Sequence, residues 1–294
     1  MTGAVAAAAS GVGFGLFQSV NRRAVARMDV YLATFVQLVV ATVVLVALAL
    51  ALEDVHRLAS APVSALAWFA GGGVIHFFVG WTLLNASQKR IGAARTSPLL
   101  ATTPLFGVAV AAATLGEVPG FLAIAGIVLV AAGAYTVGIG RGGRVVRSRW
   151  ADATFGLGCA CAWSVSPVMI REGLKGLPSP LLGLTVGLLA SVLVFAVMLG
   201  ADRRRLAGNG VAGEALSLKL AAGILVALST WGRWVAVDLT AIGVVLALNL
   251  LSVPVVLLLS PLLMGRHVEH VDLDVWIGAL LVVGGSLLLI ARNL

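Results

Sequence analysis

Two ionisable side chains stand inside long apolar stretches of this chain, where a charge is costly to bury. Arg233 lies between Trp231 and Trp234 in one stretch, and His76 lies near the middle of another. An Arg guanidinium offers a planar fork that binds a carboxylate with two hydrogen bonds, and an imidazole changes its charge near neutral pH. These residue types indicate a site for a neutral, zwitterionic or anionic solute, with His76 as a candidate proton carrier.

Both residues also have a structural interpretation. Arg233 can extend toward the nearer surface of a membrane with Trp234 at the interface, and a neutral His76 can bond to a backbone carbonyl. Asp238, five residues after Arg233, is a candidate partner for its charge. Three amide side chains in apolar stretches can bond either a solute or a neighbouring helix: Gln18, Gln37 and Asn249.

The composition indicates which environment surrounds these residues. Hydrophobic residues make up 60% of the chain and charged residues 11%, with a mean hydropathy of +1.07. A chain of 294 residues cannot bury that much apolar surface in a water-soluble core, so its solvent must be a lipid bilayer. We therefore expect an integral membrane protein.

Charged and turn-forming residues divide the chain into ten apolar stretches. Most are about 20 residues long, the length at which an α-helix crosses about 30 Å of hydrocarbon. The sequence therefore predicts an all-α membrane protein with ten transmembrane helices. The predicted helices are 3–21, 31–52, 64–86, 92–115, 119–138, 154–170, 180–200, 219–239, 241–264 and 274–291.

The second half of the sequence repeats the first. Matched residues are Phe14 with Trp163, Arg22 with Arg171, Gly92 with Gly243, Pro104 with Pro254, and Gly126 and Gly133 with Gly278 and Gly285. Five spans in each copy is an odd number, so the copies must have opposite orientations in the membrane, as in many secondary transporters. We expect two inverted five-helix repeats, 1–140 and 153–294, joined by a basic linker, 141–152.

Pro104 and Pro254 occupy matched positions in the fourth and ninth predicted helices. Proline lacks an N–H and clashes with the carbonyl four residues earlier, so both helices should be interrupted. Interrupted helices at equivalent positions of two repeats point to a central binding site. The alternative is a simple kink, in which freed backbone groups bond to nearby hydroxyl groups. The candidate hydroxyl groups belong to Thr102, Thr103 and Ser252.

The distribution of Lys and Arg predicts the orientation. Fifteen of the 20 basic residues fall on the side of the connections after odd-numbered spans, and five fall on the side of both termini. By the positive-inside rule, both termini face outward from a multi-pass protein of the cytoplasmic (inner) membrane. The same basic loops account for the net charge of +8 through contact with an anionic leaflet, so we expect no nucleic-acid partner.

The stretch from Ile91 to Gly133 contains a helix with a central proline, a turn of small residues ending in Gly-Glu, and a short Gly-spaced helix. These features are Pro104, Gly116 with Glu117, and Gly126 with Gly133, and the second copy offers Pro254, Gly265, and Gly278 with Gly285. The pattern resembles the EamA type of the drug/metabolite transporter superfamily. The resemblance covers essentially the whole chain.

This resemblance implies that helices one, three, four, six, eight and nine line a central cavity, with helices five and ten as an outer scaffold. Trp163 would then face the pathway, with packing in the core as its alternative, and Glu117 would be a gate or a helix cap. The chain departs from the family pattern at Arg266, which replaces the turn Glu in the second copy, and at Gln37, where Arg is frequent. The family also implies cytoplasmic termini, which conflicts with the charge distribution.

Together these patterns predict a secondary transporter that moves a small metabolite by alternating access, in the direction of export. The solute would be an amino acid, an organic acid or a similar neutral, zwitterionic or anionic compound. The alternative is a multidrug or cation exporter of the same fold. It is disfavoured because no Asp or Glu lies in the core of a predicted span, where a cation carrier usually has one.

A less favoured alternative is an intramembrane enzyme. Its metal ligands or acid–base groups would have to come from the segment where the repeat fails, with solvated loop residues as the ordinary interpretation. That segment contains His267, Glu269, His270, Asp272 and Asp274. We expect no enzyme activity, no cofactor and no metal. The expected partners are a small-molecule substrate, the bilayer and protons as a candidate coupling ion, in a monomer or homodimer.

Overall fold

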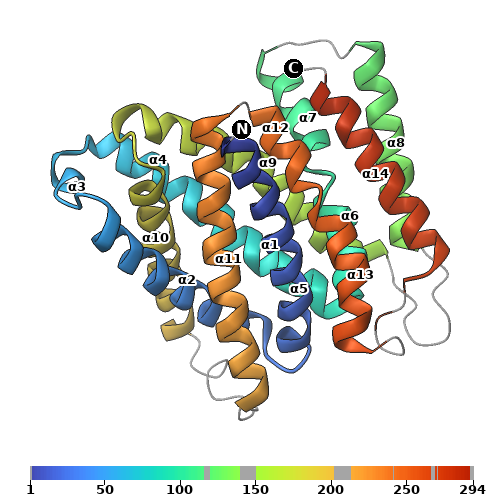
Figure 1. Cartoon of the computed structure of the whole chain (residues 1–294), viewed down its shortest axis with the longest axis horizontal. Coiled ribbons are helices and arrows are strands. Elements are labelled where there is room, and N and C mark those ends of the chain that lie inside the picture. The colour runs from blue at the N-terminus through green and yellow to red at the C-terminus, as the bar shows by residue number, and fades with distance from the viewer. Residues whose placement is uncertain are drawn as a thin grey trace.

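The computed structural model describes residues 2–115, 120–139, 150–201, 213–240, 242–265, 269 and 271–291. Within these residues the chain is a bundle of helices (Figure 1). Nine of the helical segments described are long and apolar enough to cross a membrane. This result confirms the prediction of an all-α membrane protein.

The first three spans agree closely with the predicted ranges. They are α1 (Thr2–Val25), α2 (Val30–Leu52), and a continuous helical run of α4 (Val63–Gly73), the π-helix η1 (Val74–Gly80) and α5 (Trp81–Ile91). A short helix, α3 (Arg57–Ser60), precedes α4. Asp29 fixes the start of α2, because its side chain accepts hydrogen bonds from the N–H groups of Tyr31 and Leu32 at 2.9 and 3.1 Å.

Five further spans are single helices at the predicted positions. They are α8 (Phe121–Ile139), α9 (Trp150–Gly176), α10 (Pro180–Ala201), α11 (Gly213–Leu239) and α14 (Leu273–Ala291). The structure corrects one start, because α11 begins six residues before the predicted position. Lys219, the first residue of the predicted span, therefore lies well inside the helix.

The fourth and ninth spans are each built from two helices. These are α6 (Ala93–Leu100) followed by α7 (Thr103–Leu115), and α12 (Ile242–Asn249) followed by α13 (Ser252–Met264). Neither α6 nor α7 alone is long enough to cross a bilayer, so the count of ten spans stays a prediction. The predicted interruption of both helices is confirmed.

The interruptions differ in detail from the expected proline clash. Pro104 and Pro254 lie in the first turns of α7 and α13, where the missing N–H has no intrahelical partner to lose. Backbone bonds of the i to i−3 type replace the α-helical pattern, from Thr102 N–H to the Leu99 carbonyl at 3.2 Å in the first break. As predicted, a threonine hydroxyl bonds to the carbonyl that Pro104 leaves without an N–H partner, with Thr103 donating to Leu100 at 2.7 Å.

The matched glycines bring α8 and α14 together along one side of the bundle (Figure 1). A Cβ on Gly126 would lie 2.9 Å from the Gly285 carbonyl oxygen, and one on Gly133 would lie 2.6 Å from that of Gly278. Exchanging the two repeats converts one of these contacts into the other. The contacts therefore follow the symmetry of an inverted repeat, and they place α8 and α14 outside the centre, as the family resemblance implies.

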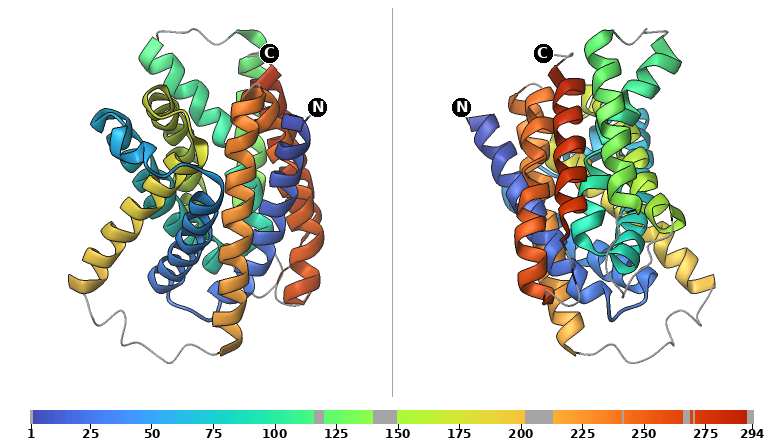
Figure 2. Two further views of the ribbon diagram at one scale, coloured as in Figure 1. Left: turned by 60° about the vertical axis from the view of Figure 1, so that its left-hand side comes forward. Right: turned by 90° about the vertical axis from the view of Figure 1, so that its right-hand side faces the viewer.

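Helix α1 lies toward one side of the bundle (Figure 2) and packs against α11, α12 and α13. Gly11 and Gly15 allow this close approach, because a Cβ at either position would collide with the Leu248 carbonyl or the Val255 side chain. The start of α1 and the end of α14 lie at the same end of the molecule, which we call the terminal end. We call the opposite end, where α1 ends and α11 begins, the basic end.

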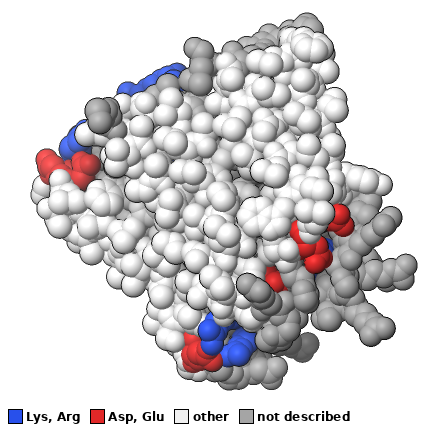
Figure 3. Space-filling model, turned by 45° about the vertical axis from the view of Figure 1, so that its right-hand side comes forward, with Lys and Arg blue, Asp and Glu red and all other residues white. Residues whose placement is uncertain are grey.

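Charged side chains at the basic end form ion pairs between helices. Glu214 binds Arg23 and Arg27, each at 2.6 Å, and Arg90 binds Asp152 at 2.9 Å. The wide uncharged area between the charged groups in Figure 3 is typical of a surface that contacts lipid.

Candidate functional site

A cavity of about 320 Å³ lies in the centre of the helix bundle. Its wall comes from α1, η1, α6, α7, α9, α11, α12 and α13, which belong to the six spans that the family resemblance implies. The lining residues are Phe14, His76, Ser97, Leu100, Ala101, Thr103, Pro104, Trp163, Ser166, Pro167, Ile170, Arg171, Leu174, Arg233, Trp234, Val237, Asp238, Thr240, Val245, Leu246, Asn249, Leu250 and Ser252.

The cavity extends from mid-bundle to the terminal end. Arg171 and Asp238 lie near the terminal-end turns of α9 and α11, and both are exposed. At its other limit Ser97 lines the cavity and is 1% exposed. Beyond Ser97, toward the basic end, Phe17, Gln18 and Asn21 on α1 are fully buried. This conformation is therefore open at the terminal end and closed at the basic end.

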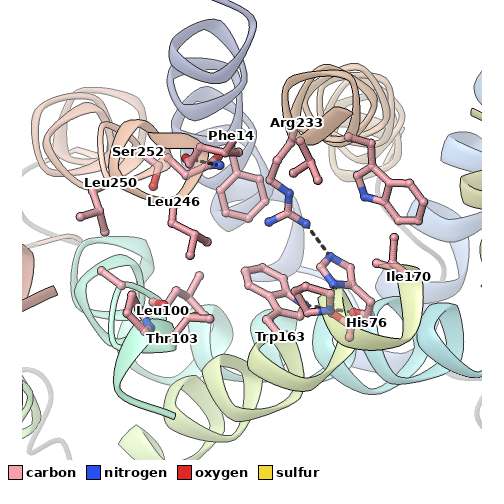
Figure 4. A pocket seen from close by; sticks show the side chains of 18 of the residues that line it. Phe14, His76, Leu100, Thr103, Trp163, Ile170, Arg233, Leu246, Leu250 and Ser252 are labelled. Atoms are coloured by element: carbon pink, nitrogen blue, oxygen red, sulfur yellow. Dashed lines mark hydrogen bonds between the residues drawn. The ribbon is translucent and has the colours of Figure 1, made fainter. Parts of the chain in front are cut away.

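The polar centre of the cavity is a chain of three side chains from three helices. Arg233 on α11 and His76 on η1 are joined by a hydrogen bond of 3.1 Å between Nη2 and Nε2 (Figure 4). The other ring nitrogen of His76, Nδ1, lies 2.8 Å from the Ser166 hydroxyl of α9. His76 is thus bonded on both sides of its ring, which fixes its orientation toward the guanidinium.

Aromatic rings form the wall next to this chain. The ring of Trp163 stacks on that of His76 with centroids 5.1 Å apart and an interplanar angle of 14°, and Phe14 meets Trp163 edge to face at 5.6 Å. The Trp163 indole N–H donates to the His76 backbone carbonyl at 3.1 Å. His76 lies in a π-helix, a backbone form that is frequent at functional sites. Gly80, in the same π-helix, has no side chain, and the Trp163 indole occupies the space where its Cβ would lie.

The charge of Arg233 has no acidic counter-ion among the described residues. Among the residues described, no Asp or Glu oxygen lies within 4.0 Å of its guanidinium. The suggested pairing with Asp238 is therefore absent in this conformation, because Asp238 lies on the cavity wall nearer the terminal end. A guanidinium that faces a cavity with only an imidazole partner is suited to bind an anionic group.

Comparison with known proteins agrees with this architecture. Residues 1–139 match the model of the EamA-like transporter family. This match, over a little less than half of the chain, indicates a membrane transporter of the drug/metabolite transporter type. The apolar helices of membrane-spanning length among the described residues make the chain a multi-pass membrane protein.

Solved structures support the fold over the whole chain, and 12 of their chains match. One, described as "Crystal structure of protein", has 22% sequence identity and a TM-score of 0.61, covering 97% of this chain and 98% of its own. No curated protein matches. At this identity the structural likeness concerns the fold alone, so the solute of this protein has to be argued from its own cavity.

Most of the predicted site residues lie in this cavity. The structure places six of them on its wall: His76, Pro104, Trp163, Arg233, Asn249 and Asp238. Pro254 is not among the lining residues, and Asn249 donates a hydrogen bond to the Val245 carbonyl at 2.9 Å. Gln18 and Gln37 lie outside the cavity and belong to the closed end. Glu117 lies outside the described residues.

The segment considered for enzyme chemistry is only partly described, since His267 and His270 lie outside the described residues. Glu269 is buried, binds Arg22 at 3.2 Å and accepts a hydrogen bond from the N–H of Ala94 at 2.8 Å. In the part of the chain that the structure describes, no group of three metal-binding side chains is found. Glu269 therefore links its own segment to α1 and α6 at the basic end.

Sequence reasoning missed a second polar cluster, which we call the closed-end cluster. It consists of Asn21, Thr34, Gln37, Asn85, Gln88 and Lys219. Lys219 is fully buried and donates hydrogen bonds to Asn21, Gln37 and Asn85. The sequence contained an indication of this cluster: Lys219 and Arg233 are 14 residues apart and lie on nearly the same face of one helix, so Lys219 could have been expected to face the interior as Arg233 does.

Proposed function

We propose that this protein is a secondary transporter that exports a small carboxylate-bearing metabolite across the cytoplasmic membrane. The solute class comprises amino acids, organic acids and similar zwitterionic or anionic compounds. The observation that carries the proposal is Arg233, whose guanidinium faces the central cavity with His76 as its partner and no carboxylate within 4.0 Å among the described residues. An incoming carboxylate would supply the missing charge.

The rest of the cavity supports a small solute with an apolar part. A volume of about 320 Å³ lies at the lower end of the range for small-molecule sites. Trp163, Phe14 and Trp234 offer flat apolar surfaces beside the guanidinium. A solute would place its carboxylate at Arg233 and its apolar part against these rings.

Alternating access is supported by the opposite states of the two ends. The cavity reaches the terminal end and is closed below Ser97 by buried residues of α1, α5 and α11. We propose that the repeats 1–140 and 153–294 rock about the cavity, with 141–152 as the linker. The interrupted spans α6–α7 and α12–α13 both contribute to the cavity wall. Their breaks therefore lie beside the cavity, where rocking of the repeats would require the backbone to bend.

The positive-inside rule supports a cytoplasmic location for the basic end. The cavity of the present conformation would then open outward, which is the state from which an exporter releases its solute. Asp238 on the wall favours a second candidate, a cation exporter of the same fold, because it places one carboxylate near the mouth.

The test is transport by purified protein in proteoliposomes. The solutes are radiolabelled amino acids, organic acids and lipophilic cations, each measured with and without a pH gradient. We expect saturable movement of a carboxylate-bearing solute. Replacing Arg233→Gln should lower its rate at low solute concentration about 10- to 150-fold, since a charge-assisted hydrogen bond contributes about 1.5–3 kcal/mol. Arg233→Lys should recover only part of the loss, because an ammonium has no bidentate fork.

The matched control is Arg57→Gln, which removes an exposed arginine that pairs with Glu53 outside the cavity. It should leave transport unchanged. Movement of cations alone, with Arg233→Gln as active as the parent and Asp238→Asn inactive, would replace this proposal with the cation exporter.

A further inference from the structure

We propose that Lys219 is a proton-binding site of this transporter and that its ammonium form holds the basic end closed. The inference rests on the proposed function in one respect only, namely that the basic end must open during transport. It assigns the coupling proton to the closed-end cluster instead of His76. It also explains why this chain has a lysine inside its eighth span.

The geometry of the closed-end cluster matches an ammonium group. Lys219 Nζ donates to Asn21 Oδ1, to Gln37 Oε1 at 2.7 Å and to Asn85 Oδ1 at 3.3 Å. An ammonium has three N–H donors and no acceptor, so three amide oxygens use all of them. The three oxygens come from α1, α2 and α5 of the first repeat, whereas Lys219 comes from α11 of the second. One protonated side chain thus joins both repeats.

Two of the three amides, Asn21 and Asn85, are held with their oxygens toward Lys219. Asn21 Nδ2 donates to Asn85 Oδ1 at 2.7 Å and to Gln88 Oε1 at 2.8 Å, and Asn85 Nδ2 donates to the Thr34 hydroxyl at 2.8 Å. Because these two nitrogens are occupied elsewhere, a flip of Asn21 or Asn85 that turned an N–H toward Lys219 would break these bonds. Gln37 Nε2 has no partner among the described residues, so the Lys219 ammonium is itself what favours an inward-facing Gln37 oxygen. The cluster therefore favours the charged form of Lys219.

The described parts of the surrounding helices offer Lys219 no counter-ion. No carboxylate oxygen among the described residues lies within 4.0 Å of Nζ. Helices α10 and α12 contain no ionisable side chain, and α2 contains only Tyr31.

The ionisable groups on α1, on α5 and at the start of α11 have partners of their own. Arg22 binds Glu269, Arg23 and Arg27 bind Glu214, Lys89 donates to the Met28 carbonyl at 2.6 Å, and Arg90 binds Asp152. A fully buried cation without a counter-ion is costly, so Lys219 keeps its proton only while the three amide bonds are intact.

Loss of the proton would weaken the closed end. A neutral amine has two N–H donors and one lone pair, so one of the three amide oxygens would lose its donor. An unsatisfied buried acceptor costs about 1–3 kcal/mol, and separating α11 from α1, α2 and α5 would let water satisfy it. The proton would pass to water that enters from the basic end.

A path toward the cavity also exists in this conformation. Gln18 lies about one turn before Asn21 on α1, and its Nε2 bonds the Ser97 hydroxyl at 3.4 Å on the cavity floor. Its buried Oε1 has no partner among the described residues. We infer that this oxygen accepts a hydrogen bond from a water between the cavity and the cluster, by which Lys219 regains its proton from the terminal side.

The first experiment measures opening of the basic end without a transported solute. Ser97→Cys, in a Cys159→Ala, Cys161→Ala background, is labelled from the basic side of oriented proteoliposomes with a membrane-impermeant maleimide over a pH series. The labelled fraction is corrected for thiol ionisation with a free thiol. The parent should label slowly at low pH and at least about 10-fold faster once Lys219 is neutral, the ratio for 1.4 kcal/mol. Lys219→Met should label fast at every pH, and Lys219→Arg should label slowly.

The second experiment observes the proton itself. The chain has only three lysines, Lys89, Lys175 and Lys219, so ¹⁵N-lysine labelling gives three side-chain signals, and Lys219→Arg identifies the third. Its signal should lose the proton over the pH interval in which Ser97→Cys labelling rises. This measurement does not depend on Lys219→Met folding.

Equal pH profiles in the parent and Lys219→Arg would overturn the proposal. A Lys219 signal that stays protonated while the labelling changes would also overturn it. Neither experiment uses a solute, so a negative result here leaves the solute panel intact. Conversely, failure of the solute panel leaves the behaviour of Lys219 to be judged by its own titration.

Discussion

Helix α11 carries two cationic side chains in contrasting surroundings. Lys219 and Arg233 are 14 residues apart, which is about four turns and about 21 Å along the axis. Arg233 faces a cavity that extends to the terminal end, with His76 as its hydrogen-bond partner. Lys219 is fully buried, and its three donors bond three amide oxygens.

The role of each cation therefore depends on its burial and on how many of its N–H donors are already bonded within the protein. A guanidinium that faces a cavity with donors to spare can exchange partners with a solute at little cost to the fold. An ammonium whose donors are all used holds helices together, and releasing it costs the bonds of every acceptor. We therefore expect substitutions at Arg233 to lower transport with little loss of stability, and substitutions in the closed-end cluster to lower the stability of the fold.

The largest effect on stability should follow Asn85→Leu. Asn85 accepts from Asn21 and Lys219 and donates to Thr34, so leucine would leave both Lys219 and Asn21 short of a partner. We expect a loss of about 3 kcal/mol or more, seen as a lower midpoint of thermal unfolding by tryptophan fluorescence in detergent.

Arg233→Gln is the matched comparison for this change. Its midpoint should move by less than a third of the shift for Asn85→Leu, because its group faces a cavity that solvent enters. Equal shifts of the two midpoints would show that the cavity charge is as structural as the closed-end cluster, and the comparison would fail.

A smaller effect should follow Gly80→Ala, which acts only on the cavity. The added methyl group would overlap the Trp163 indole and displace the ring that stacks on His76. We expect solute affinity to fall by about 1–3 kcal/mol, the usual cost of overpacking, with little change in the pH profile of Ser97→Cys labelling. Gly71→Ala in the same span is the control, since its methyl group would meet only the flexible end of Met169.

If Gly80→Ala changed the labelling profile as strongly as Lys219→Met, the two regions would be one coupled unit. Solute binding in the cavity would then change the labelling of Ser97→Cys from the basic side. Such a result would indicate that His76 and α11 couple the two sites.

The sequence predicted the fold because hydropathy and repeat spacing depend on local composition. The lengths of the apolar stretches predicted the membrane spans, and the matched residues Pro104 and Pro254 predicted both helix interruptions. The separate helices α6 and α7 could not be predicted, because the start of α7 depends on how Thr102 and Thr103 bond to the freed carbonyls. Local sequence does not determine whether a proline bends a helix or begins another.

The cavity residues were found from a different rule, that polar groups in apolar stretches face the interior. This rule predicted His76 and Arg233, whereas Trp163 was predicted from the family resemblance and its match to Phe14, and all three line one cavity. It failed for Gln18 and Gln37, which are equally polar but belong to the closed end. Sequence gives the residue type and the depth in the membrane, whereas the face of each helix that meets the cavity depends on packing.

The smallest effect should follow Ser166→Ala, which tests how finely the cavity site is ordered. The Ser166 hydroxyl lies 2.8 Å from His76 Nδ1 and is fully buried, so its loss frees one side of the imidazole. We expect solute affinity to weaken about fivefold, the equivalent of one hydrogen bond of about 1 kcal/mol. The control is Ser164→Ala on the same helix, where the hydroxyl bonds only its own backbone at Cys161. If Ser164→Ala matched Ser166→Ala, the orientation of His76 would not matter to binding. Arg233 would then bind the solute without help from its neighbour, just as Lys219 holds the closed end with neutral amides alone.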